Sequence, residues 1–232
     1  MNFMFIIQGE GKGHFSQALV LKTWLENQGH HISSVHMGKA LPANKVSYAD
    51  TAWSGGIDYF YSPGFLRNAR KKGILPLLSV LWNILLSPLY VYSAFQLSRI
   101  MSNGKTDRII NFYDPVAGFA WLLSGRKKKM FSLGHQFYQG RHVSPELSPH
   151  RFSLFLLRTL NAFSSMGSVI LALTIREEED KPDSPGKFYY VPPVLEKPVS
   201  PENAGQARHV LVYFLNHGFL RELSGIAEKH PQ

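Results

Sequence analysis

Short apolar runs alternate along this chain with longer segments whose apolar residues recur at helical spacing. Strand-like runs lie at residues 2–8, 31–36, 57–61, 107–111, 129–133 and 168–173, and a further short one at 187–191. Residues 15–28 and 151–164 are predicted helices, and Gly29 is well suited to end the first of them. This alternation predicts an α/β fold built on a doubly wound parallel sheet.

The first predicted strand opens directly into a glycine loop, Gln8-Gly9-Glu10-Gly11-Lys12-Gly13-His14. Alternate glycines let a backbone approach a ligand closely, and the free N–H groups of the helix that follows favour negative charge. A dinucleotide-binding loop would need G-x-G-x-x-G and an acidic residue about 20 positions further on. Here the third glycine comes one residue early and residues 27–49 contain no Asp or Glu, so NAD binding is not expected.

Composition narrows the class of protein further. A chain of 232 residues has room for one large domain or for one domain with a fragment of a second. The absence of cysteine excludes disulfides and thiolate metal sites and is typical of a reducing cytoplasm. The formal charge of +9 indicates an anionic partner, although no nucleic-acid recognition motif is present. One basic cluster, residues 126–129, is expected to be a solvated loop before a strand.

A second basic cluster precedes an uncharged stretch, residues 73–98, that is long enough to cross a bilayer. Pro76 and Pro88 would break a spanning helix, and Asn83 and Gln96 are polar, which leaves buried core helices or a membrane-docking face as alternatives to a span. The docking alternative assigns head-group contact to Arg67, Arg70, Lys71, Lys72 and Trp82.

Four motifs in order resemble one known family. The first is Gly9-x-Gly11-x-Gly13-His14-x-x-Gln17-Ala18 with Leu25-x-x-x-Gly29-His30-x-Ile32; the others are Asn111-Phe112-Tyr113-Asp114-Pro115-x-Ala117-Gly118, Gly134-His135-Gln136 and Val191-Pro192-Pro193. Together they are similar to nucleotide-sugar glycosyltransferases of the GT-B fold. Within that fold, the chain more specifically resembles bacterial proteins that open with Q-G-E-G-x-G-H. These proteins are distant relatives of lipid II N-acetylglucosaminyltransferases and of UDP-glucuronosyltransferase-like enzymes.

The resemblance implies an inverting transfer of a sugar from a nucleotide-sugar donor, with His14 as the general base. Histidine suits this role because its ordinary pKa is near neutrality. Asp114 is the candidate partner that would orient His14, and its alternative role is a helix cap before Pro115. His14 likewise has the alternative role of a structural residue at a helix start, and Glu10 is a weaker candidate base.

Residues that could hold phosphate or the acceptor are Gly9, Gly11, Gly13, His135 and Arg141. The resemblance implies a UDP-sugar or other nucleotide-sugar as substrate, no further cofactor and no metal. The acceptor is a glycan or a lipid-linked molecule, and the expected location is the cytoplasm, at the inner face of the membrane if the docking alternative holds.

The predicted domain boundaries follow from changes in charge and proline content along the chain and from the resemblance. Residues 1–190 would form the Rossmann-like acceptor-side domain, 191–207 a proline-rich linker, and 208–232 the first strand and helix of a donor-binding domain. By itself such a chain is expected to be inactive in transfer. Two other functions stay open, namely a non-catalytic acceptor-binding domain and a nucleotide-sugar epimerase of the same fold.

Overall fold

The computed structural model describes residues 1–10, 12–41, 49–50, 53, 55–66, 75–103, 105–142, 151–174 and 187–193. Within these ranges seven strands form one sheet in the order β3-β2-β1-β4-β5-β6-β7, and all neighbours pair in parallel. The strands are β1 (Asn2–Ile7), β2 (His31–Lys39), β3 (Asp58–Tyr61), β4 (Arg108–Phe112), β5 (Lys129–Gly134), β6 (Val169–Leu173) and β7 (Phe188–Val191). Each strand predicted between residues 2 and 191 is present, and the doubly wound parallel sheet is confirmed. The strand predicted within residues 208–232 lies outside the described residues.

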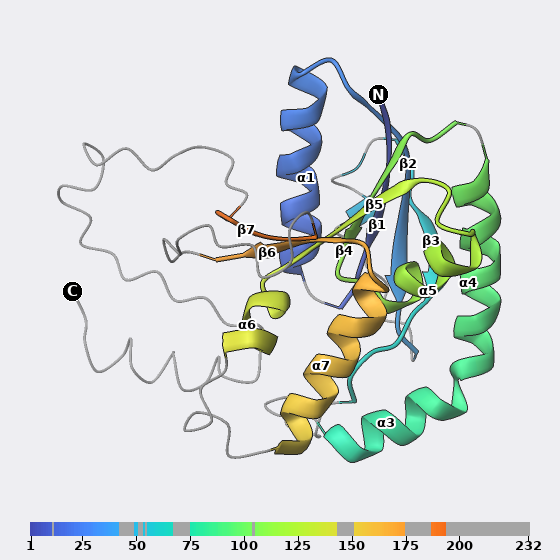
Figure 1. Cartoon of the computed structure of the whole chain (residues 1–232). Helices are drawn as coiled ribbons and strands as arrows, with labels where there is room; N and C mark the ends of the chain where they lie inside the picture. Colours follow the sequence, from blue (N-terminus) through green and yellow to red (C-terminus); the bar gives the residue numbers. More distant parts are fainter. Residues whose placement is uncertain are drawn as a thin grey trace, which may run out of the picture.

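Helices cover both faces of this sheet (Figure 1). They are α1 (Lys12–Asn27), α3 (Pro76–Leu85), α4 (Ser87–Ser102), α5 (Pro115–Leu123), α6 (Gln136–His142) and α7 (Arg151–Ser165). Successive side chains of a strand point to opposite faces, so β1 supplies both layers of the core. Phe5 and Ile7 pack in the cluster that contains residues of α1, whereas Met4 and Ile6 pack in the cluster that contains residues of α4 and α5.

Helix α1 begins at Lys12, three residues before the predicted start at Phe15. His14 therefore lies inside the first helical turn rather than in the loop before it. The loop at residues 126–128 joins α5 to β5, as the sequence predicts, and the guanidinium of Arg126 lies over the ring of Trp121.

The uncharged stretch forms two helices, α3 and α4, which are bent by 63° relative to each other. Helix α4 buries Ala94, Leu97 and Met101 against the sheet, so the core-helix prediction is correct for α4. It is wrong for α3, whose one buried residue is Ser79. No single described helix is long and apolar enough to cross a membrane, and α3 with α4 would meet that criterion only as a broken pair.

The predicted linker and second domain lie almost wholly outside the described residues, which end at residue 193. The domain boundaries therefore stay a prediction.

Candidate functional site

The order of the strands reverses between β1 and β4. From β1 the chain passes outward to β2 and β3, and it then returns to place β4 on the other side of β1. Loops diverge at such a point and leave a crevice at the carboxyl ends of the strands. His14 follows β1, Tyr113 follows β4 and His135 follows β5, so three ring side chains lie at this edge.

The loop after β4 is shaped by the buried side chain of Asn111. Its Oδ1 accepts a hydrogen bond from the Asp114 N–H (2.8 Å), and its Nδ2 donates to the Asp114 carbonyl (2.9 Å). Inside this turn Tyr113 has a φ of 64°, a left-handed conformation that bulky residues rarely adopt. The hydroxyl of Tyr113 donates to Oδ1 of Asn161 in α7 (2.6 Å), which fixes the ring in place.

His14 sits among these rings. Its side chain is almost fully buried, and its ring is nearly parallel to those of Tyr113 (centroids 5.8 Å apart) and His135 (6.2 Å). Burial, with a smaller contribution from the nearby His135, lowers the pKa of His14 to about 4. The imidazole is therefore neutral at physiological pH, and one of its two nitrogens carries a lone pair that can accept a proton.

Gln136 is the hydrogen-bond partner of His14. Its Nε2 lies 3.2 Å from Nε2 of His14, and an amide N–H that faces this nitrogen leaves the proton of the ring on Nδ1. Neither Nδ1 of His14 nor Oε1 of Gln136 has a hydrogen-bond partner among the described residues, although both atoms are buried. Buried polar atoms are usually paired, so each of these two atoms has unused capacity for a hydrogen bond.

The side chain of Asp114 caps the N-terminus of α5. Its Oδ1 accepts from the backbone N–H groups of Val116 (2.8 Å) and Ala117 (3.2 Å), and its Oδ2 accepts from the hydroxyl of Ser62 (2.6 Å). Burial raises the pKa of Asp114 to about 6, although these hydrogen bonds act in the opposite direction. None of the hydrogen bonds of Asp114 within the described ranges reaches His14, so the structure gives Asp114 the helix-cap role that the sequence left open.

The glycines of the first loop differ in what surrounds them. A Cβ added to Gly9 would lie 1.8 Å from the carbonyl oxygen of Gly38 in β2, so Gly9 is needed for the packing of two backbones. Gly38 in turn has no room for a side chain, because a Cβ there would lie 2.5 Å from Oδ2 of Asp114. Gly13 is exposed and has nothing within 4 Å of the added atom, whereas Gly11 lies outside the described residues. Gly13 is thus the described glycine of the loop with open space for a ligand.

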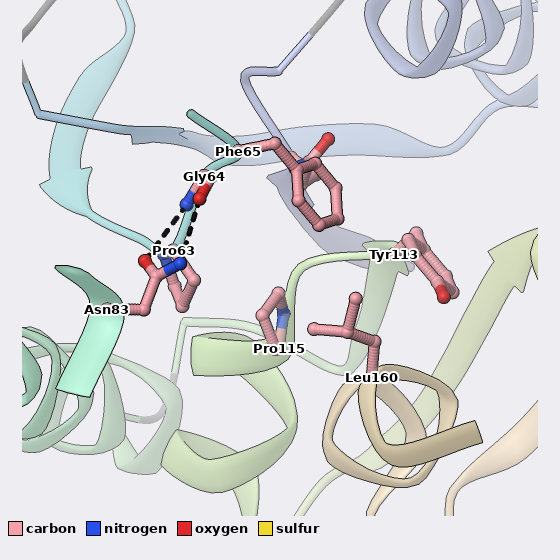
Figure 2. A pocket seen from close by; sticks show the side chains of 8 residues that line it. Pro63, Gly64, Phe65, Asn83, Tyr113, Pro115 and Leu160 are labelled. Carbon is pink, nitrogen blue, oxygen red and sulfur yellow. Dashed lines mark hydrogen bonds between the residues drawn. The ribbon is translucent and has the colours of Figure 1, made fainter. Parts of the chain in front are cut away.

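A small pocket lies beside this edge (Figure 2). Its walls come from the ends of three strands and from α3, α5 and α7, and its lining residues are Gln8, Pro63, Gly64, Phe65, Asn83, Tyr113, Pro115 and Leu160. The side-chain amide of Asn83 holds Gly64 through hydrogen bonds to its N–H (3.3 Å) and carbonyl (2.8 Å). The carboxylate of Glu10 accepts from the Phe65 N–H at 2.9 and 3.1 Å, which ties the glycine loop to the same wall.

The two remaining predicted binding residues lie in different places. His135 is next to His14, and burial lowers the pKa of His135 as well. Arg141 is exposed near the end of α6, with its guanidinium 3.9 Å from the ring centroid of Phe188. It lines a second cavity together with Arg158 and Asn161, and His14 is not part of that lining. The structure thus brings His135, and not Arg141, to His14.

Of the predicted membrane-docking residues, Arg67, Arg70, Lys71 and Lys72 lie outside the described residues. Trp82 is half-buried in α3, and its indole N–H donates to the carbonyl of Leu41 (3.0 Å). Its ring therefore helps to hold α3 against the loop after β2.

Sequence reasoning gave no role to Tyr113 or Gln136, although both stand within the quoted motifs. Their positions were the signal in the sequence. Tyr113 comes directly after the end of β4, and Gln136 lies two residues after the end of β5. Glu10 was a candidate base, and in the structure its carboxylate serves the Phe65 backbone.

No family model matches the chain, and no curated protein matches it. Among solved structures it is similar to MurG of Acinetobacter baumannii (15% identity over 74% of this chain and 41% of that chain, TM-score 0.38). It is also similar to Arabidopsis thaliana UGT89C1 complexed with UDP-L-rhamnose (16%, 75% and 44%, TM-score 0.43) and to LpCGTa in complex with UDP (12%, 75% and 47%, TM-score 0.44). The chain spans less than half the length of each of these proteins. These similarities concern the course of the chain.

Proposed function

We propose that this chain is the acceptor-side half of an inverting glycosyltransferase that uses a nucleotide sugar, with His14 as the general base. The observation that carries the proposal is a buried, neutral imidazole at the point where the strand order reverses, with Nδ1 unpaired among the described residues. The order of the GT-B-like motifs along the sequence supports the same reading.

The proposed reaction needs a proton acceptor and a displaced leaving group. The acceptor hydroxyl gives its proton to His14 while its oxygen forms a bond to the anomeric carbon of the sugar. The bond from that carbon to the nucleoside diphosphate breaks on the opposite side, and the diphosphate leaves with the electron pair. Attack from the opposite face inverts the configuration at the anomeric carbon.

Gln136 would take the orienting role that the sequence assigned to Asp114. A half-turn of its amide places Oε1 against an Nε2–H of His14 and leaves Nδ1 as the bare acceptor that a base requires. A carbonyl oxygen also stabilises the imidazolium that forms when His14 takes the proton, which a low pKa otherwise disfavours. Gln136 would thus act as a positioning residue.

One observation favours a binding function without catalysis. The carboxylate of Asp114 is engaged by α5 and Ser62, so the imidazole has no anionic partner among the described residues. In that case His14 would form one hydrogen bond, as donor or as acceptor, with a hydroxyl of the sugar acceptor, and it would not take up a proton. Substitutions of His14 would then weaken binding of the sugar acceptor, and neither the wild type nor the variants would show turnover.

Turnover is tested on the chain extended through the donor-side domain that the sequence predicts from residue 208. Release of nucleoside diphosphate from a panel of nucleotide sugars is the measurement. We expect His14→Ala to lower kcat by roughly 10²–10⁴, as the loss of a general base should. His31→Ala is the matched control, because His31 is exposed at the start of β2, the opposite edge of the sheet. Equal turnover in the His14 variant and in the control, with both folded, would remove His14 from the base role.

A further inference from the structure

A second cavity lies between the helices α6 and α7 and the strands β6 and β7, and it shares no lining residue with the pocket of Figure 2. Helix α6 lies beside α7 (Figure 1). The two helices approach closely, because a Cβ on Gly140 of α6 would clash with the side-chain amide of Asn161 in α7. The cavity measures about 230 Å³, whereas sites for drug-sized ligands begin at about 300 Å³. Its size therefore suits a small ligand.

The walls of this cavity carry basic and no acidic side chains. The sequences of α6, α7, β6 and β7 contain no Asp or Glu, so none of these elements offers a carboxylate to a cation in the cavity. Helix α6 contributes Arg141 to the lining, and helix α7 contributes Arg158. Positive charge from two helices, with no negative charge in the walls, favours an anionic ligand.

Both guanidinium groups are held at the cavity by a contact to its own walls. The guanidinium of Arg141 lies 3.9 Å from the ring centroid of Phe188, and this stacking occupies the face of the group, whereas its N–H donors lie along the edge. The Nε–H of Arg158 donates to the carbonyl of Gly140 (3.3 Å). In the part of the chain that the structure describes, the two terminal nitrogens of Arg158 have no hydrogen-bond or ion-pair partner. Paired N–H donors of this kind match the oxygen atoms of a phosphate group.

The inner wall of the cavity is apolar. Phe137 and Phe188 are almost fully buried and Ile170 is half-buried, whereas Arg141 and Arg158 are exposed. The charged groups therefore lie toward the solvent, and the apolar side chains lie beneath them. A ligand that is complementary to both parts has an anionic group at one end and an apolar group at the other.

Asn161 separates this cavity from the site of His14. It lines the cavity, and its Oδ1 accepts from the hydroxyl of Tyr113 (2.6 Å) while its Nδ2 donates to the carbonyl of Gln136 (3.0 Å). Tyr113 and Gln136 are in turn neighbours of His14. A ligand in the cavity would thus lie next to the residue that holds two neighbours of His14, and His14 itself is not part of the lining.

We propose that the cavity between α6 and α7 binds a small phosphate monoester, with its phosphate at Arg158 and Arg141 and its organic group against the apolar wall. Two guanidinium groups match the charge of about −1.5 to −2 that a phosphate monoester carries at pH 7 better than they match the single charge of a carboxylate. Arg141 keeps the phosphate contact that the sequence predicts, but its partner comes from α7 and the site is separate from His14. The proposal does not rest on sugar transfer.

Binding is tested by isothermal titration calorimetry of the full chain with phenyl phosphate, inorganic phosphate and benzoate at pH 7.5. We expect phenyl phosphate to bind more tightly than the other two, because inorganic phosphate lacks the apolar group and benzoate carries one negative charge. Arg158→Gln should lower the affinity for phenyl phosphate by at least about tenfold, since it removes charge-assisted hydrogen bonds.

Two further variants serve as comparisons. Arg99→Gln is the matched control, because Arg99 is exposed on α4 and outside the cavity lining, and the substitution removes the same charge. Arg158→Lys keeps the charge and loses the paired N–H donors, so its affinity for phenyl phosphate should fall between those of the wild type and Arg158→Gln. Circular dichroism verifies that each variant is folded.

Equal affinity of the Arg158→Gln and Arg99→Gln proteins for phenyl phosphate would overturn the proposal, and so would a wild type that does not bind phenyl phosphate. Benzoate that binds as tightly as phenyl phosphate would also overturn it, in favour of a site for organic anions in general. Binding that appears only after neutralisation of the acidic run at residues 177–180 would show that the chain's own carboxylates take the cavity. The titration needs no turnover, so its failure leaves the His14 proposal intact, and a fully active His14→Ala variant would leave the phosphate site intact.

Discussion

The two described glycines of the first loop should respond in opposite ways to the same substitution. In Gly9→Ala the new methyl group would lie 1.8 Å from the carbonyl oxygen of Gly38, which is backbone and has no rotamer to change. Strands β1 and β2 would have to separate, and overpacking of this kind costs about 3 kcal/mol. In Gly13→Ala the methyl group meets nothing within 4 Å and lies in the first turn of α1, where alanine gains up to roughly 0.5–1 kcal/mol over glycine.

Thermal and urea denaturation of the full chain, followed by circular dichroism, measure this difference. For a domain of this size 1 kcal/mol moves Tm by roughly 2–4 °C, so Gly9→Ala should lower Tm by about 6–12 °C and Gly13→Ala should raise it by about 1–4 °C. Gly13→Ala should nevertheless weaken the binding of any ligand that approaches the backbone of the loop. A Gly9→Ala protein as stable as the wild type, or a destabilised Gly13→Ala protein, would refute this account of the loop.

Two further predictions concern buried titratable groups. The folded state holds His14 neutral down to a pKa of about 4, whereas the unfolded imidazole binds a proton below 6.5, so stability on the order of 3 kcal/mol should be lost as the pH falls from 6.5 to 4. Urea midpoints at pH 7.5 and pH 5 should show about 2 kcal/mol of this loss in the wild type and less in His14→Phe, and an equal loss in the two proteins would contradict the prediction. Asp114→Ala should cost about 1–2 kcal/mol at pH 7 through the lost helix cap, which urea titration measures. Asp114→Asn keeps an oxygen that can accept the hydrogen bonds of the cap, and it removes a carboxylate whose pKa burial raises to about 6. Ionisation of that carboxylate lowers the stability of the wild type as the pH rises from 3.8 to 6. The Asp114→Asn protein should therefore be at least as stable as the wild type at pH 7.

The sequence alone determined the order and type of the elements. Alternating apolar runs and helical segments are local patterns, and they predicted each strand of the sheet and its parallel winding. They also placed His14 after β1 and the loop of Asp114 after β4, because the carboxyl ends of parallel strands share one edge.

Tertiary structure decided what each of these residues contacts. Asp114 and His14 lie at the same edge, yet the carboxylate of Asp114 accepts hydrogen bonds from the hydroxyl of Ser62 and from N–H groups of α5. Gln136 meets His14 through the fold rather than through any spacing in the sequence. The apolar content of residues 76–102 was plain from composition, but only packing separated α4, which is buried in the core, from α3, whose leucines face outward. Composition reports how apolar a helix is, whereas its neighbours in space determine which face is covered.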